Sequence, residues 1–151
     1  MVRNDIMDKM ELKFSPTLKN AQMGTIAAAK IASAFYNLIK NDDPDQNFST
    51  DVELAVGEAC TNCVKYSENL DTGDKTVIVT FETDDEKLVI QVKDQNPEFD
   101  FHGVSVPDFS EVPEGGYGIF IIREKMDLVT YMHTNGWNCV TMTKFIASPI
   151  I

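Results

Sequence analysis

The chain has 151 residues, of which 43% are hydrophobic and 25% are charged, a composition typical of a single globular domain. Thirteen Lys and Arg oppose 24 Asp and Glu, giving a net charge of −11, which excludes binding to nucleic acid or anionic lipid through bulk charge. A ligand that carries phosphates would need a divalent cation to balance its charge.

Two helices are predicted in the first half of the chain, after a short edge strand at 11–14 that ends before Pro16. An Ala-rich apolar pattern predicts a helix over 17–40, which could pack against another helix or against a second copy in a homodimer, with core packing favoured. Thr50 and Glu53 have the spacing of a capping box, so a second helix is predicted from Thr50 to about Glu68.

In the second half, β-rich alternation over 76–83 and 87–93 predicts a hairpin. Residues 95–115 have no clear period, a helix is expected after Gly118, and segments 128–133 and 137–146 form a second hairpin around Asn135-Gly136. The expected fold class is α+β: a two-layer sandwich with a mixed, mostly antiparallel sheet and helices on one face.

Three short motifs could carry chemistry. Glu58 and Asn62 lie one helical turn apart, at the margin of an apolar stripe, and could hold a metal ion or a water, although such a pair is commonly a surface feature. Asp94 ends a predicted strand and could accept a hydrogen bond from an amino group, or simply form a turn. Gly115, Gly116 and Gly118 precede a helix, where backbone N–H groups can approach an anion, although the pattern alone is weak.

In this order, the three motifs resemble the N, G1 and G2 boxes of the Bergerat-fold ATPases, the superfamily of gyrase, the heat-shock chaperone and histidine kinases. The segments 58–62 (EACTN) and 115–123 (GGYGIFIIR) look most like the bacterial anti-sigma factor serine/threonine kinases. The resemblance covers roughly residues 14–146 and implies a single ATP-binding kinase-like domain over 1–151, ordered over about 11–147, with an ATP lid at about 99–114.

The resemblance also implies residue roles. Glu58 would be the general base for a serine hydroxyl, and Asn62 would coordinate Mg²⁺ on the phosphates of ATP. Asp94 would receive the adenine amino group. The remaining nucleotide contacts would come from Asn96, Gly115, Gly116, Gly118 and Ile119.

By the same resemblance, the substrate would be a serine on a small anti-sigma factor antagonist protein, and the other partner would be a sigma factor or a similar effector. Two alternatives stay open. One is a non-catalytic module that regulates by sequestering a partner, since Asn96 and Glu98 replace the usual glycines, Tyr66 replaces a frequent His, and Asn138-Cys139 replaces a common Gly-Thr pair. The other is a detached histidine-kinase ATPase domain.

Charge and cysteine content add two expectations. Residues 94–122 contain no Lys or Arg but six acidic residues, so nucleotide binding should depend strictly on the metal or on a partner's basic residue. Three cysteines, a charged N-terminal segment and the lack of a stretch of about 18 apolar residues predict a reduced, cytoplasmic protein without a leader or membrane span. Cys60 and Cys63 are expected to be buried core residues rather than zinc ligands.

Overall fold

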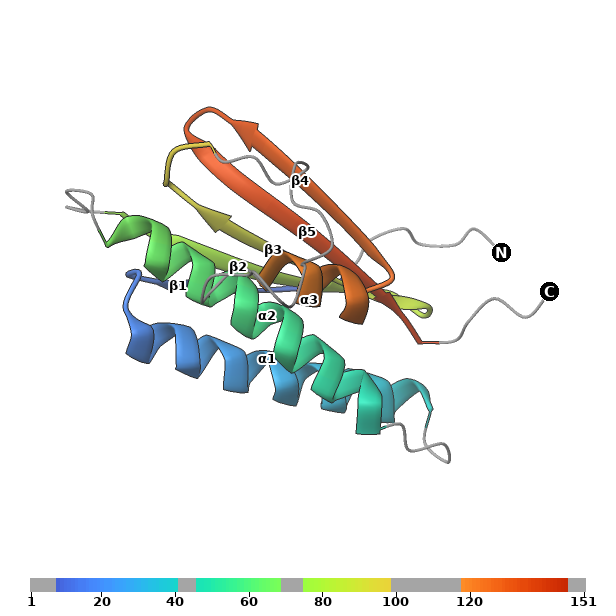
Figure 1. Cartoon of the computed structure of the whole chain (residues 1–151). Coiled ribbons are helices and arrows are strands. Elements are labelled where there is room, and N and C mark those ends of the chain that lie inside the picture. The colour runs from blue at the N-terminus through green and yellow to red at the C-terminus, as the bar shows by residue number, and fades with distance from the viewer. Residues whose placement is uncertain (1–7, 41–45, 69–74, 99–117, 147–151) are drawn as a thin grey trace, which may run out of the picture.

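A five-stranded sheet and three helices on one of its faces form two layers (Figure 1). The computed structural model describes residues 8–40, 46–68, 75–98 and 118–146. The elements follow in the order β1 (Asp8–Phe14), α1 (Leu18–Ile39), α2 (Gln46–Ser67), β2 (Val77–Thr83), β3 (Lys87–Asp94), α3 (Gly118–Lys125), β4 (Leu128–Thr134) and β5 (Trp137–Phe145). This order and the α+β sandwich confirm the sequence-based prediction.

The sheet has the strand order β1-β2-β3-β5-β4, and all four of these pairings are antiparallel. The predicted hairpin turn at Asn135-Gly136 is present, with φ angles of 54° and 81°, the left-handed pair that a two-residue hairpin needs. In the β2–β3 hairpin, Oδ1 of Asp84 accepts hydrogen bonds from the backbone N–H groups of Glu86 and Lys87, at 2.8 and 3.0 Å.

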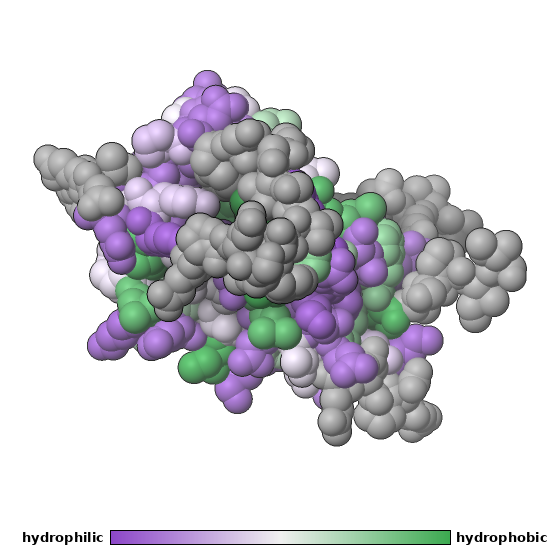
Figure 2. All heavy atoms as spheres, viewed as in Figure 1, coloured by the Kyte–Doolittle hydropathy of each residue, from purple (hydrophilic) through white to green (hydrophobic). Residues whose placement is uncertain are grey.

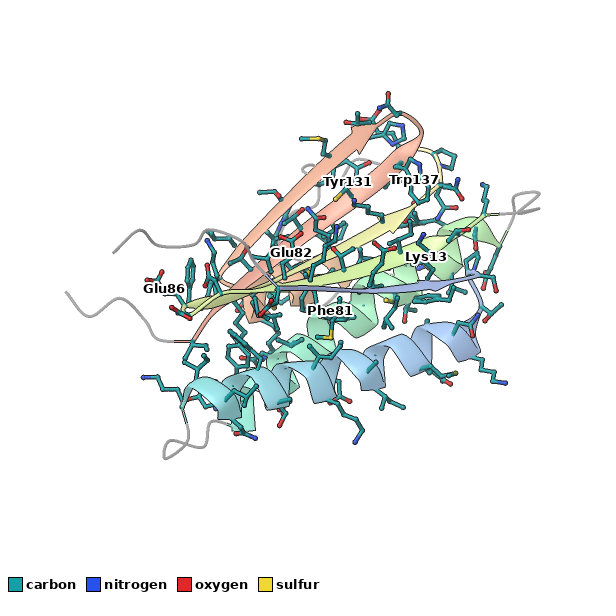
Figure 3. The ribbon with its side chains drawn as sticks, turned by 180° about the vertical axis from the view of Figure 1, so that it is seen from behind. Lys13, Phe81, Glu82, Glu86, Tyr131 and Trp137 are labelled. Atoms are coloured by element: carbon teal, nitrogen blue, oxygen red, sulfur yellow. The ribbon has the colours of Figure 1, made fainter. Side chains whose placement is uncertain are left out.

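The core lies between the sheet and the helices, because alternate strand residues point to the helix-covered face. Figure 3 shows Phe81 in this layer, between the sheet and α1 and α2, and its side chain is fully buried. Helix α1 presents Ala21, Ala28 and Ala32 to the core, so core packing is confirmed for the Ala-rich helix. Its N-cap is Thr17, whose hydroxyl accepts from the N–H of Asn20 at 3.2 Å.

The capping box predicted at Thr50 and Glu53 is wrong, because α2 begins four residues earlier, at Gln46. Burial of Phe48 gives the physical reason for the extra turn. Its ring is 2% exposed and lies 5.1 Å from the ring of Tyr36 and 6.3 Å from that of Phe35, centroid to centroid. The apolar contact therefore fixes the start of the helix, and Thr50 lies inside it.

The described surface is mostly hydrophilic, and Figure 2 shows apolar side chains as separate patches among polar ones in the view of Figure 1. Exposed large apolar residues include Leu18, Met23, Ile26 and Leu38 on α1. In the part of the chain that the structure describes, no helix is both long and apolar enough to cross a membrane.

Candidate functional site

Helix α2 places Glu58 and Asn62 beside each other on one face. The apolar stripe predicted for this helix is present, since Val52, Val56 and Cys60 are fully buried. Glu58 and Asn62 are half-buried, which confirms their position at the margin of the stripe. A carboxylate and an amide are thus held at the edge of the core, where they stay accessible to a ligand.

The first residue of α3 meets this pair. A β-carbon added at Gly118 would lie 3.0 Å from Oε2 of Glu58, 3.1 Å from Nδ2 of Asn62 and 3.3 Å from its Oδ1. Only glycine leaves room here for two polar side chains. The structure therefore brings the carboxylate and the amide of α2 together with the glycine at the start of α3, which lies more than fifty positions later in the sequence.

Asp94 is the last residue of β3, as predicted, and its side chain is buried. Its Oδ1 accepts hydrogen bonds from the N–H of Asn96 at 3.0 Å and from Nδ2 of Asn138 at 2.9 Å. Its Oδ2 accepts from the thiol of Cys63 at 3.1 Å. All three neighbours act as donors, so Asp94 serves as a hydrogen-bond acceptor toward the rest of the protein.

Asn96 is buried against α2, and its Nδ2 donates to the backbone oxygen of Cys63 at 3.1 Å. Its Oδ1 has no hydrogen-bond partner in the described part of the chain, an unusual state for a buried amide oxygen. The left-handed backbone that would have suited Asn at this position is not used, since positive φ among the described non-glycine residues occurs at Asn135. Glu98 is exposed.

Burial and the negative charge of Asp94 raise the pKa values of nearby groups on α2. Burial raises the pKa of the Cys63 thiol well above its usual value, and the negative charge of Asp94 raises it further. The same two causes, in the same order, raise the pKa of Tyr66, and the neighbouring Cys63 adds to them. Burial raises the pKa of Cys60 to about 12. Both cysteines are buried and free, which confirms that they are core residues.

A small hollow connects these features. Residues from α2, α3, β3 and β5 line it, both polar and apolar: Ala59, Asn62, Cys63, Tyr66, Val92, Asp94, Ile119, Ile122 and Val140. Asn62 and Asp94 therefore open onto one space whose remaining walls are largely apolar.

A second groove lies between α1 and α2, and Glu58 lines it together with Thr25, Ile26, Glu53 and Leu54. Glu58 consequently stands between the two spaces. One of its sides faces Asn62 and Gly118, and the other faces an open groove on the molecular surface.

Not every predicted site residue can be placed. Glu58, Asn62, Asp94, Gly118 and Ile119 surround the hollow or its rim. Gly115, Gly116 and the predicted lid at 99–114 lie outside the described residues. Sequence reasoning gave no site role to four residues that contact Asp94 directly or through one neighbour: Cys63, Tyr131, His133 and Asn138. The sequence did contain a signal for Asn138, because alternation along β5 places it on the same face as the buried Val140 and Met142.

Comparisons with known proteins identify a family for this chain. A family model described as "Histidine kinase-like ATPase domain" matches residues 19–144. Serine-protein kinases RsbW of Bacillus cereus (strain AH187) and Bacillus thuringiensis subsp. konkukian (strain 97-27) are each 35% identical to this chain over 104 residues. These matches cover 64% of this chain and 63% of each relative, so the chain spans less than two thirds of their length.

One solved structure is similar over most of the chain. It is a crystal structure of the RsbU and RsbW domains of Rv1364c from Mycobacterium tuberculosis, with a TM-score of 0.61 and 14% identity. The match covers 91% of this chain and 32% of that one. At this identity the similarity concerns the fold.

Proposed function

The chain belongs to the histidine kinase-like ATPase family, and we propose that it is an ATP-dependent serine/threonine kinase of the anti-sigma type. The proposed substrate is a serine on a small antagonist protein, and the second partner is a sigma factor or a similar effector. Similarity to serine-protein kinases RsbW supports this proposal. We place the activity in a single ATP-binding domain in the cytoplasm, in accord with three free cysteines.

The observation that carries the proposal is the meeting of Glu58, Asn62 and Gly118. Phosphoryl transfer needs a group that orients the attacking hydroxyl, a cation on the phosphates and close backbone access to them. In the proposed roles, Glu58 accepts the proton of the serine hydroxyl. Gly118 opens the start of α3 to the phosphates, because no β-carbon stands between them and the backbone.

Adenine would lie at the other end of the hollow. Asp94 would accept a hydrogen bond from the amino group of the base, since the described groups that hydrogen-bond to its carboxylate are all donors. Val92, Val140 and Ile122 supply apolar walls, which favour burial of a flat aromatic ring.

The residues present fit Mg²⁺ held mainly by the nucleotide. Among the described residues, no group of three His, Cys, Asp or Glu side chains could hold a metal ion. Asn62 offers an amide oxygen beside Gly118, and Mg²⁺ commonly takes one or two protein oxygens together with phosphates and water. When bound, the ion would neutralise charge on the phosphates.

The groove between α1 and α2 supports a protein substrate. Because Glu58 lines this groove as well as the space beside Gly118, a segment lying in the groove could bring a hydroxyl to the carboxylate, next to the proposed place of the phosphates. A second candidate function, a non-catalytic binding module, is favoured by Asn96 and Glu98, which stand where the family usually has glycines.

The decisive experiment is transfer of label from γ-labelled ATP to a purified candidate antagonist protein. We expect Glu58→Gln to lower transfer at least about 100-fold while ATP binding persists. Glu68→Gln is the matched control, because Glu68 is exposed directly after the same helix and lines neither the hollow nor the groove, and it should transfer at nearly the normal rate. Unchanged transfer by Glu58→Gln would contradict the proposed role of Glu58 as the base. ATP binding without transfer by the unmodified protein would favour the binding module.

A further inference from the structure

Three adjacent strands carry a row of polar side chains on the helix-covered face of the sheet. Asp94 of β3 is the direct cross-strand partner of Asn138 of β5, which is in turn the partner of His133 of β4. The next pair on the same face is apolar, Val92 opposite Val140. Asn138 is 1% exposed. Burying an amide in the core of a sheet lowers stability unless the amide is fully hydrogen-bonded. The hydrogen-bond partners of Asn138 therefore indicate its role.

The chemistry of those partners fixes the orientation of the Asn138 amide. Its Nδ2 lies 2.9 Å from Oδ1 of Asp94, 2.8 Å from the backbone oxygen of Asn96 and 3.1 Å from that of Pro97, all of them acceptors. Its Oδ1 accepts a hydrogen bond from the hydroxyl of Tyr131 and lies 3.0 Å from Nδ1 of His133. A flipped amide would set its oxygen against three acceptors, so only one orientation is stable.

This orientation determines how Asp94 behaves. Oδ1 is held by two donors, the amide of Asn138 and the N–H of Asn96. Oδ2 accepts a hydrogen bond from the thiol of Cys63. Because a carboxylate oxygen accepts about two hydrogen bonds, Oδ2 can accept one more. Since Asp94 and Cys63 both line the hollow, that remaining acceptor position is available to a ligand there.

We propose that Asn138 is a positioning residue for base recognition: its amide, oriented by Tyr131, holds Asp94 as a fixed acceptor and thereby sets a preference for a purine with an amino group at position 6 over one with an oxo group. This inference rests on the proposed binding of ATP at Asp94. Tyr131 and His133 act through Asn138 and need not touch the nucleotide. Figure 3 shows Tyr131 on the β4–β5 part of the sheet.

Replacing the amide by a carboxyl group provides a specific test. In Asn138→Asp, two carboxyl groups would lie within hydrogen-bond distance and would share a proton, because like charges at this distance disfavour double ionisation. Asp94 or its partner could then donate as well as accept. Among the described residues, the charged and titratable groups facing this pair are Cys63 and Tyr66 from α2 and Tyr131 and His133 from β4, and none of them is changed by the substitution.

The experiment compares dissociation constants of MgATP and MgITP by calorimetry, because the two nucleotides share their phosphates and sugar and differ at position 6. We expect the unmodified protein to prefer ATP at least about 30-fold and Asn138→Asp to lower that ratio at least about fivefold. Asn135→Asp is the control. It makes the same substitution three residues away, at an exposed turn position, and should leave the ratio within about twofold.

Tyr131→Phe provides a second variant that keeps the ring and removes only the hydroxyl. It removes one of the two groups that hold Oδ1 of Asn138, the other being His133, and should lower the ratio by a smaller factor than Asn138→Asp does. It decides the question if Asn138→Asp does not fold. A folded protein with an unchanged ratio in the variants would overturn the positioning role while leaving ATP binding intact. If the unmodified protein binds neither nucleotide, the proposed function fails, and this inference fails with it.

Discussion

Gly118 and Glu58 lie so close that a β-carbon on the glycine would be 3.0 Å from Oε2 of the carboxylate. This contact joins the start of α3 to the middle of α2 at the point where the proposed chemistry occurs. The atoms that a methyl group would meet are the ends of two side chains, Glu58 and Asn62. They can rotate away, so the fold tolerates a methyl group better than the site does.

Gly118→Ala should therefore reduce phosphoryl transfer without lowering stability. Alanine favours a helix over glycine by up to about 1 kcal/mol, whereas displacement of the two side chains should lower transfer about 10- to 100-fold. Label transfer and thermal unfolding measured on the same sample check this. The control is Gly24→Ala in α1, whose new methyl group would meet only the ring of Phe14, at 3.3 Å. Full activity of Gly118→Ala would contradict the assigned geometry.

Nucleotide binding should depend strongly on Mg²⁺. Residues 94–122 contain six acidic residues and no Lys or Arg, so the phosphates would be repelled unless a cation is present. We expect EDTA or Asn62→Ala to weaken ATP binding by about 100-fold or more. Adenosine, which has no phosphates, serves as the internal control, and its weaker binding should be the same with and without EDTA. Calorimetric titration would refute this expectation if ATP bound with equal affinity in EDTA.

Much of the fold could be predicted because each pattern acts locally. Alternation of apolar residues predicted the strands. The pair Asn135-Gly136 predicted the second hairpin, whose turn has the expected left-handed backbone. The start of α2 could not be predicted this way. It depends on the contact of Phe48 with Phe35 and Tyr36 of the preceding helix, and this tertiary contact outweighed the local capping signal at Thr50.

The candidate site likewise contains residues that continuous motifs indicate and residues whose roles depend on contacts between distant segments. Glu58, Asn62 and Gly118 were found because their motifs are short and continuous in the sequence. Asn138 was noticed only as a departure from a family pattern, because its role depends on β5 lying beside β3, a pairing between strands that are not consecutive. The thiol of Cys63 was taken for core packing alone, and nothing local reveals that it reaches Asp94.

Phe48 should contribute strongly to stability. Its ring is 2% exposed and packs against Tyr36, and the ammonium group of Lys144 lies 5.9 Å from the ring centroid. We expect Phe48→Ala to lower the free energy of unfolding by about 3–5 kcal/mol. Leu54→Ala on the same helix, where the side chain is 43% exposed, should cost about 1 kcal/mol or less. Urea unfolding measures both, and a cost below about 1 kcal/mol for Phe48→Ala would show that the first turn of α2 is not anchored by this ring.

The three thiols should differ sharply in reactivity. Cys60 and Cys63 are buried, and burial raises the pKa of both above the ordinary value of 9.0, so at pH 8 neither forms the reactive thiolate. Cys139 is only half-buried. A disulfide reagent at pH 8 should therefore modify one thiol of the folded protein quickly and the other two only after unfolding. Cys139→Ser should remove the fast phase, and rapid modification of two or three thiols would contradict the buried placement of α2.

Alkaline pH should destabilise the fold through the same cysteines. Because the pKa of Cys60 in the folded state is about 12 and its ordinary value is 9.0, the folded protein retains a proton that the unfolded chain loses. The contribution of Cys60 to the free energy of unfolding is fully present below pH 9 and is lost as the pH rises toward 12. Over this range the free energy of unfolding should fall by up to about 1.4 kcal/mol per pH unit. Cys60→Ala removes this group, so the free energy of unfolding, measured by urea titration between pH 8 and 10.5, should fall less steeply with pH in the variant. Parallel curves for the two proteins would show that Cys60 does not titrate differently in the folded and unfolded states.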